Sequence, residues 1–317
     1  MRNNMKNRKY FYPLIIGIMT ALLTFTGCSN YNDSNTETMQ QDVEKSAETD
    51  STSEKFSEAE SPEPTITEID WSDYFGGLNG AAVIYDPTEE NYMIYNKELA
   101  LTQRPPCSTF KIISSLISLE SGIINPDDSV RPWSGEIFWN EDWNRDITFS
   151  DAFRTSCVWY FRQVTDDIGK EKMQAELNKL KYGNCDISDW KGTLNTNSDN
   201  PALTGFWIES SLKISPKEQV EVMERIFGND STYTEKTQNI LKQVMLVTEP
   251  NVTDIPVYGK TGLGAAENIV VDAWFTGFAE TIDGNKYFCV YLGQSDEQET
   301  SSAIAKQIAI QILNDNF

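Results

Sequence analysis

The sequence predicts an α+β fold (α/β in the broad sense), in which helices flank one antiparallel sheet and form a helical subdomain. Short apolar runs rich in β-branched and aromatic residues occur early and late in the chain, and a turn at Asp86-Pro87 separates the two early ones. The predicted strands comprise residues 81–85, 92–95, 256–258, 273–279 and 287–292. Because the strands come from both ends of the chain, we expect a helical insertion between two parts of a single sheet.

The helices are predicted from apolar residues at helical spacing in the long middle region and at the C-terminus. The predicted helices comprise residues 110–119, 152–164, 173–180, 220–227 and 303–313. The chain has 317 residues, of which 39% are hydrophobic and 11% aromatic, and this composition is enough for a sizeable core.

Composition also excludes several functions. The net charge of −22 leaves no basic surface to neutralise phosphates, so we expect no nucleic-acid partner. The chain has no histidine, which excludes Ser-His-Asp and Cys-His catalysis and the common zinc motifs. We therefore expect no metal, and a hydrolase of this composition must take its base from Lys, Asp, Glu or Tyr.

The N-terminus is typical of an export signal. A basic start with Arg2 and Lys6 precedes the apolar stretch 10–25, and Thr26-Gly27-Cys28 ends it. Residues 1–28 resemble a bacterial lipoprotein signal in which Cys28 becomes the lipidated first residue. The alternatives are an ordinary signal peptide and an uncleaved anchor with a chance cysteine.

A polar segment follows, from residue 29 to 65, rich in Ser, Thr, Asn, Gln, Asp and Glu. Such a composition cannot bury enough apolar surface to fold, so we predict a disordered acidic tether. The folded catalytic domain is then predicted to comprise residues 66–317.

The first motif of chemical interest is Ser108-Thr109-Phe110-Lys111, directly after Pro105-Pro106. The prolines place Ser108 near a helix N-terminus, and residues three apart share a helix face, so Lys111 can reach the Ser108 hydroxyl. A serine hydroxyl needs a nearby base, and burial can keep a lysine amine neutral. Alone, Ser-x-x-Lys is a weak signal, equally compatible with a helix cap and a solvated lysine.

Two further motifs strengthen this interpretation. Lys260-Thr261-Gly262 follows an apolar stretch where a sheet-edge strand is expected, and its lysine could bind a substrate carboxylate. Ser156-Cys157-Val158 lies between the other two motifs in the sequence. The three motifs in this order resemble the penicillin-recognising serine enzymes, that is, β-lactamases and penicillin-binding proteins.

The middle motif indicates the subgroup, since Val158 matches the Ser-x-Val of class D β-lactamases. Four other segments resemble class D motifs: 182–184 (Tyr-Gly-Asn), 206–210 (Phe-Trp-Ile-Glu-Ser), 212–215 (Leu-Lys-Ile-Ser) and 273–277 (Ala-Trp-Phe-Thr-Gly). The resemblance spans residues 66–313 and implies a β-lactamase/transpeptidase-like fold. It is greatest for the lipid-anchored class D enzymes of Gram-positive bacteria.

The resemblance implies a role for each motif residue. Ser108 would be the acylated nucleophile, and Lys111 its base, carrying a CO2-derived carbamate as its only modification and no other cofactor. Phe110, Val158 and Ile208 would keep the Lys111 amine dry, and Trp207 would donate its N–H to a carbamate oxygen. Ser156 would relay a proton to the lactam nitrogen. The remaining implied roles are substrate binding by Lys260, Thr261 and Gly262, and an oxyanion hole formed by the N–H groups of Ser108 and Leu263.

One departure concerns the substrate carboxylate. Many class D enzymes bind it with an arginine on the last helix, and that position falls at Ala305 here, next to Lys306. Recognition of the carboxylate is therefore expected to rest on Thr261, Lys260 and Ser156.

The state of the cysteines is left open by the sequence. Besides Cys28 there are four: Cys107, Cys157, Cys185 and Cys289. A bridge between Cys107 and Cys157 is conceivable because each adjoins a motif serine, and an exported protein permits it. The alternative is that all four are small buried hydrophobic residues.

The function implied is hydrolysis of β-lactams, penicillins among them, through an acyl-serine intermediate, which would confer β-lactam resistance. The alternatives are a penicillin-binding protein, a β-lactam sensor that is acylated without efficient turnover, and a plain substrate-binding lipoprotein. We expect a monomer, exported and lipid-anchored on the outer face of the cytoplasmic membrane, with part of it released.

Overall fold

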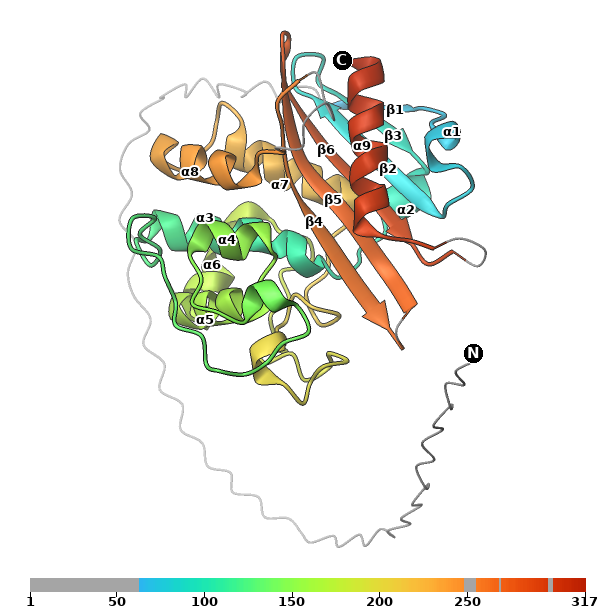
Figure 1. Ribbon diagram of the computed structural model, residues 1–317. Coiled ribbons are helices and arrows are strands. Elements are labelled where there is room, and N and C mark those ends of the chain that lie inside the picture. Colours follow the sequence, from blue (N-terminus) through green and yellow to red (C-terminus); the bar gives the residue numbers. More distant parts are fainter. Residues whose placement is uncertain (1–62, 248–254, 268, 296–298) are drawn as a thin grey trace, which may run out of the picture. The chain divides into compact units, whose positions relative to one another are not determined.

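Six strands form one sheet in the order β1-β3-β2-β6-β5-β4 (Figure 1). The computed structural model describes residues 63–247, 255–267, 269–295 and 299–317. The strands are β1 (Thr65–Glu68), β2 (Gly80–Asp86), β3 (Asn91–Tyr95), β4 (Val257–Ala266), β5 (Ile269–Thr281) and β6 (Gly284–Gly293). All five predicted strands are confirmed, and the three late ones are longer than predicted.

The sheet joins the two ends of the chain, as predicted, because β2 pairs antiparallel with β6 from Gly80↔Leu292 to Tyr85↔Tyr287. It is a mixed sheet, however, since β1 pairs parallel with β3. The prediction of a purely antiparallel sheet is wrong at this strand. All four residues of β1 are exposed, so no alternation of burial marked it as a strand.

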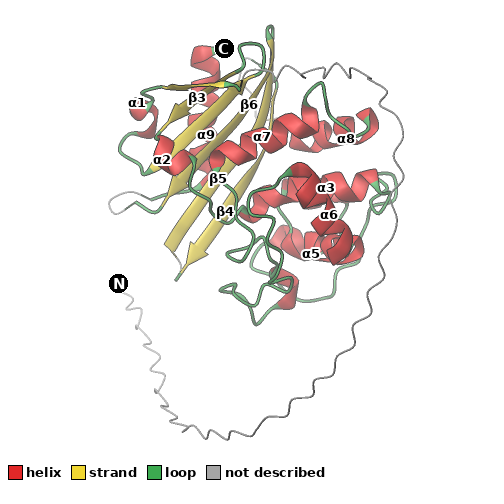
Figure 2. Ribbon diagram, turned by 180° about the vertical axis from the view of Figure 1, so that it is seen from behind, coloured by secondary structure: helices red, strands yellow, loops and turns green. Residues whose placement is uncertain are grey.

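The helices lie on both faces of the sheet (Figures 1 and 2). The longer ones are α3 (Lys111–Glu120), α5 (Val158–Ile168), α6 (Lys170–Leu180), α7 (Pro216–Phe227), α8 (Glu235–Met245) and α9 (Ser302–Asn316). The shorter helices are α1 (Ser72–Phe75), α2 (Lys97–Ala100), α4 (Phe149–Arg154) and the 3-10 turns Cys107–Phe110, Glu141–Trp143 and Pro201–Leu203.

Two hydrophobic cores result from the alternation of side chains along the strands. Val83 of β2 packs into the core shared with α3, α5, α6 and α7, whereas its neighbour Ile84 packs into the core shared with α9. Figure 2 shows α7 against the sheet on the side of the helical region, and Figure 1 shows α9 on the other face. The predicted helical subdomain is therefore packed on one face of the sheet only.

Two predictions about helices need correction. The predicted helix 152–164 is two helices, α4 and α5, because Ser156 between them has a left-handed backbone with φ 58°. α8 was not predicted, since Leu241 and Met245 are the only apolar residues among its three buried positions. The other predicted helices are present with slightly different ends.

The N-terminal predictions lie outside the described residues. They are the lipoprotein signal 1–28 with Cys28, and nearly all of the tether, of which only residues 63–65 are described. Within the described part of the chain, no helix is both long and apolar enough to cross a membrane.

Candidate active site

Ser108 and Lys111 meet at the start of α3. A 3-10 turn (Cys107–Phe110) leads directly into the helix, of which Lys111 is the first residue. Lys111 Nζ lies 2.9 Å from Ser108 Oγ. The predicted contact across one helical turn is therefore present, at hydrogen-bond distance.

The amine of Lys111 is enclosed by apolar groups. Its side chain is only 1% exposed, and Nζ lies 5.6 Å from the centre of the Phe161 ring. Burial disfavours the ammonium and lowers the pKa of Lys111 to about 8. Phe161 was missed by the sequence reasoning, although it lies one helical turn after Val158 on α5 and could have been found by that spacing.

Trp207 lies beside the turn that carries Ser108. The backbone N–H of Cys107 donates to the Trp207 carbonyl at 2.9 Å, and the Trp207 ring stacks on Phe110 with centroids 5.7 Å apart. The indole Nε1 is buried and has no hydrogen-bond partner among the described residues. A buried donor of this kind indicates that an acceptor belongs beside it.

Val158 and Ile208, the other two residues predicted around Lys111, are half-buried and pack against the same core as Phe110 and Trp207. The four apolar residues predicted for this environment therefore share one core with Phe161.

Ser156 occupies the break between α4 and α5. Its left-handed backbone ends α4, and its Oγ is buried without a partner among the described residues. The preceding carbonyl, that of Thr155, accepts the indole N–H of Trp143 at 3.1 Å. This contact holds the break in place, so that Ser156 presents a hydroxyl with free hydrogen-bonding capacity.

Strand β4 is the edge strand that was predicted, and its glycines let it approach the Ser108 turn. A Cβ on Gly262 would lie 2.9 Å from the Pro106 carbonyl oxygen, and one on Gly264 would lie 2.9 Å from Cys107 Sγ. Because side chains alternate along a strand, Lys260 points to the same face as these two glycines. The Lys-Thr-Gly motif thus lies inside β4, in the edge strand where it was expected.

Lys260 is 6% exposed, and its Nζ donates to the Thr261 carbonyl at 3.1 Å. Burial lowers the pKa of Lys260 well below its ordinary value, and the positive charges of Lys111 and Lys306 lower it further. An anion bound between these amines would reverse that effect, since it favours the charged form of each.

The last helix contributes a lysine to this region. Lys306 lines a cavity of about 160 Å³ with Lys260, Thr261 and Arg154, although Ser108 is not part of its lining. Ala305, where an arginine was expected, is buried in the core under α9. Of the residues expected to recognise the carboxylate, Lys260 and Thr261 line this cavity, and Lys306 and Arg154 line it beside them.

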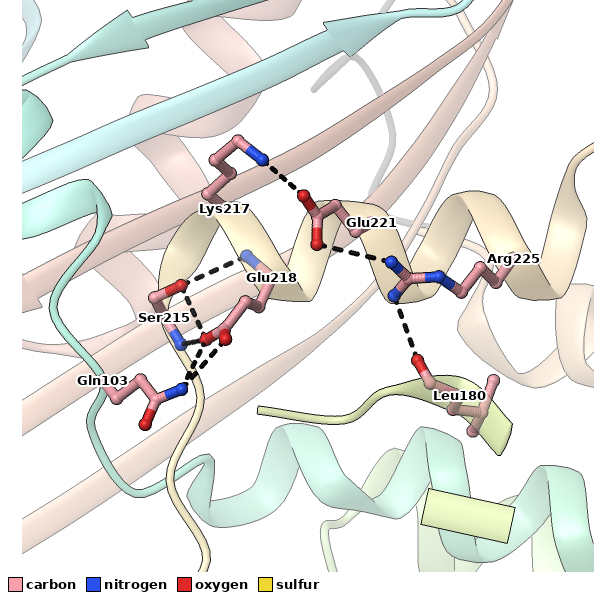
Figure 3. A network of polar contacts seen from close by, with 7 residues as sticks. All are labelled: Gln103, Leu180, Ser215, Lys217, Glu218, Glu221 and Arg225. Atoms are coloured by element: carbon pink, nitrogen blue, oxygen red, sulfur yellow. Dashed lines mark hydrogen bonds and ion pairs between the residues drawn. The ribbon is translucent and has the colours of Figure 1, made fainter. Parts of the chain in front are cut away.

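A layer of polar contacts supports the Ser108 turn from α7. Thr109 Oγ1 accepts from Gln219 Nε2 at 2.9 Å and donates to the Pro106 carbonyl at 2.7 Å. Figure 3 shows the N-terminal end of α7, where Ser215 and Glu218 form a reciprocal capping box and Gln103 donates to the Glu218 carboxylate. The segment that leads to Ser108 is thereby attached to α7 by side chains that sequence reasoning did not select.

Glu209 connects the Trp207 loop to β4. One carboxylate oxygen accepts the Ala265 N–H at 2.9 Å, and the other accepts the Thr196 hydroxyl at 2.8 Å. Ala265 lies two residues after Leu263, the predicted oxyanion-hole residue, whose side chain is about half exposed.

The four cysteines of the described region are free. The hypothesis of a Cys107–Cys157 bridge is therefore wrong. The alternative of small buried residues is confirmed for Cys107, Cys157 and Cys289, whereas Cys185 is only partly buried.

Known proteins are similar to this chain over nearly the whole of its described region. Residues 80–314 match the family described as penicillin binding protein transpeptidase domain. The probable β-lactamase YbxI of Bacillus subtilis is 30% identical over 248 residues, which cover 78% of this chain and 85% of YbxI. The regulatory protein BlaR1 of Bacillus licheniformis is 29% identical over 255 residues, which cover 80% of this chain but only 40% of BlaR1.

Similarity to solved structures agrees with the sequence matches. The crystal structure of a class D β-lactamase from Bacillus subtilis superimposes with a TM-score of 0.66 and 31% identity. The superposition covers 78% of this chain and 95% of that one. The likeness therefore includes nearly the whole of that enzyme.

Proposed function

We propose a function from one premise: the chain belongs to the penicillin-binding transpeptidase family and, within it, to the class D β-lactamases. The proposal is that it hydrolyses β-lactams through an acyl-Ser108 intermediate and so confers β-lactam resistance. One observation carries it, namely the buried Lys111 amine 2.9 Å from Ser108 Oγ. Burial lowers its pKa to about 8, so at a given pH a larger fraction of this amine is neutral and able to accept a proton than of an exposed lysine.

In the acylation step, Ser108 Oγ attacks the lactam carbonyl carbon while Lys111 takes the hydroxyl proton. The bond between that carbon and the lactam nitrogen breaks, and Ser156 passes a proton to the nitrogen. The N–H groups of Ser108 and Leu263 would stabilise the negative oxygen. In the second step, water attacks the ester, and the products are free Ser108 and the ring-opened acid.

The residues around Lys111 fit a carbamate on its amine. Formation requires a neutral amine, whose nitrogen adds to the carbon of CO2 with loss of one proton, and burial of Lys111 favours the neutral form. The buried Nε1 of Trp207 lacks an acceptor among the described residues, and it can donate but not accept. When present, the carbamate supplies an anionic base for the water that attacks the ester. Phe110, Phe161, Val158 and Ile208 keep bulk water away from this position.

Substrate binding is proposed for β4 and the end of α4. Lys260 and Thr261 would hold the substrate carboxylate, and Lys306 and Arg154 would add positive charge beside them. Gly262 allows β4 to approach the Ser108 turn, so the substrate would lie between Thr261 and the Ser108 hydroxyl.

The second candidate function is a β-lactam sensor that is acylated and barely hydrolyses the adduct. The observation that favours it is the similarity to the regulatory protein BlaR1, of which this chain spans 40%. A sensor and a hydrolase share the acylation machinery and differ in the second step only.

Turnover of nitrocefin separates these functions. A hydrolase gives sustained colour at many equivalents, and bicarbonate raises its rate, whereas a sensor or a transpeptidase stops after one equivalent. Ser108→Ala should abolish both behaviours, while Ser121→Ala, at the end of the same helix, should leave them intact. Mass spectrometry with a penicillin should find the adduct on Ser108, and its absence together with absence of product would contradict the proposal.

The role of Trp207 has its own test. Trp207→Ala should slow deacylation more than acylation, because its N–H is proposed to bind the group that activates water. Normal turnover of this variant in bicarbonate-free buffer would exclude the carbamate.

We also propose that the protein is exported as a monomer and lipid-anchored through Cys28, with part of it released. The export and the lipid anchor are proposed from the sequence of residues 1–28. Cys28→Ala should abolish membrane association in fractionated cells, and unchanged association would contradict it.

A further inference from the structure

Arg162 lies between two tryptophan rings on the side of α5 that faces the Trp207 loop. Its guanidinium carbon is 5.4 Å from the centre of the Trp190 ring and 5.4 Å from that of the Trp207 ring. The residue is only 8% exposed, so bulk water does not screen these contacts strongly. A desolvated arginine over an indole is the favourable form of the cation–π interaction.

The guanidinium is fixed by hydrogen bonds as well as by the rings. Nε donates to Asp166 Oδ2 at 3.2 Å, and a second nitrogen donates to Asp166 Oδ1. NH1 donates to the Trp190 carbonyl at 3.0 Å. Because these three contacts determine the plane of the guanidinium, they also determine which way it faces Trp207.

Trp207 lies in the core that surrounds Lys111, and its buried indole N–H has no acceptor in the part of the chain that the structure describes. A positive charge at the face of an indole draws electron density toward it, which leaves the N–H hydrogen more positive. Hydrogen bonds are stronger when the acceptor is ionised, so the more positive N–H hydrogen strengthens a bond to an anionic oxygen in particular. Arg162 should therefore stabilise the state in which Lys111 carries a negative group more than the state in which it does not.

We propose that Arg162 is a positioning residue that raises the affinity of Lys111 for CO2 through Trp207. This inference rests on the proposed function, since it assumes the carbamate. In the step concerned, the Lys111 nitrogen forms a bond to the CO2 carbon, one C=O electron pair moves to oxygen, and the amine proton leaves to solvent. Arg162 touches none of these atoms and acts through the orientation and polarity of the Trp207 N–H.

The experiment is a titration with ¹³C-labelled bicarbonate, in which the carbamate signal of the intact protein is followed by NMR. Arg162→Gln should raise the half-saturating bicarbonate concentration about three- to tenfold, the range expected for a partly desolvated cation–π contact. Arg162→Lys keeps a cation and should recover part of this loss.

Arg131→Gln is the matched control. The guanidinium carbon of Arg131 lies 5.3 Å from the centre of the ring of Tyr160, a residue of α5, and Arg131 pairs with Asp167. Arg131 therefore makes the same kind of contact with α5, but away from Trp207. Its half-saturation should equal that of the wild type. An equal shift in both variants would overturn the proposal, because it would show a general effect of loosening α5.

The outcomes also separate the inference from the function on which it rests. No carbamate signal in the wild type overturns the inference together with the carbamate, and a half-saturation unchanged by Arg162→Gln overturns the inference alone. Absence of nitrocefin turnover and of an adduct on Ser108 overturns the proposed function itself. Should Arg162→Gln fail to fold, Trp190→Leu is the second variant. Trp190 is half-buried, and this change removes the second ring that holds the guanidinium. This variant should also raise the half-saturation, and an unchanged value contradicts the proposal.

Discussion

Lys111 is a buried amine that loses its proton at a lower pH in the folded state than in the unfolded state. The pKa is lowered to about 8 by burial in the folded protein, against about 10.4 in an unfolded chain. Between these values the unfolded state binds more protons, so stability from this group rises with pH. Below about pH 8 both states are protonated, and the folded state carries the full cost of a buried charge.

The prediction is that Lys111→Met is more stable than the wild type at pH 7, by on the order of 2–4 kcal/mol. The difference should shrink as the pH rises from 8 toward 10.4. Urea unfolding in CO2-free buffer at pH 7 and pH 10 measures it. A difference that does not depend on pH would show that folding does not lower the pKa of Lys111, as for an amine that stays hydrated in the folded protein.

Lys306 gives a second prediction at the residue scale. Lys306→Ala should raise KM for penicillins about three- to tenfold with little change in kcat, because it removes a positive charge near the carboxylate site. Lys236→Ala on the exposed side of α8 serves as the control. The effect should vanish with a substrate whose carboxylate is esterified, and an equal loss on the ester would contradict the assignment.

The sequence alone was enough to group site residues that lie close together in the chain. Ser108 and Lys111 are three residues apart, and a helix brings such residues together whatever the rest of the fold does. Gln219 could not be assigned to the Ser108 turn, because its contact with Thr109 spans 110 residues. Arg162 was likewise passed over, since the two rings that enclose it come from a later loop.

The approach of β4 to the Ser108 turn is a property of whole elements. Gly262 and Gly264 present no Cβ to the turn, and this allows the strand to pack against it. A side chain as small as a methyl group at either glycine would increase the distance between β4 and the turn that carries Ser108.

Gly264→Ala should therefore slow acylation by at least tenfold, since its Cβ would lie 2.9 Å from Cys107 Sγ and push β4 outward. Cys107→Ala removes the sulfur and should restore much of the rate in the double variant. Stopped-flow measurement of acylation gives all four rates of the cycle. Purely additive losses would mean that the two positions do not meet.

Element boundaries followed the sequence less closely than element types. β4 extends beyond its apolar run because Lys260, Thr261 and Gly262 continue the ladder with β5, although they are not part of an apolar pattern. β1 was missed because a strand exposed at every residue shows no alternation, and α8 because its buried stripe is narrow. The break at Ser156 depends on a backbone conformation that residue type alone does not specify.

The described region is held together without disulfides. Four thiols should therefore react per denatured, unreduced molecule from residues 63–317, in a count with a thiol reagent. Reducing agent should leave Tm unchanged, since there is no bridge to break. A count of two, or a lower Tm in reductant, would show a bridge.

The fold class was predictable because strands occur near both ends of the folded region and helices occur between them. This order implies one sheet that is built from both ends, with the helices as an insertion. The helical region and the antiparallel strands are confirmed, and the two cores account for most of the aromatic residues. What the order of elements did not predict is the parallel pairing of β1 with β3, which depends on how the chain enters the sheet.

The pairing of β2 with β6 has a consequence for synthesis. About two hundred residues separate the partners Gly80 and Leu292, so a nascent chain carries β2 with an open edge until its last tenth is made. Closing so long a loop is entropically costly, and contacts of this range make folding slow. Ribosome-bound chains that end before Gly284 should consequently fail to react with a penicillin, even though Ser108 and Lys111 have long since been translated.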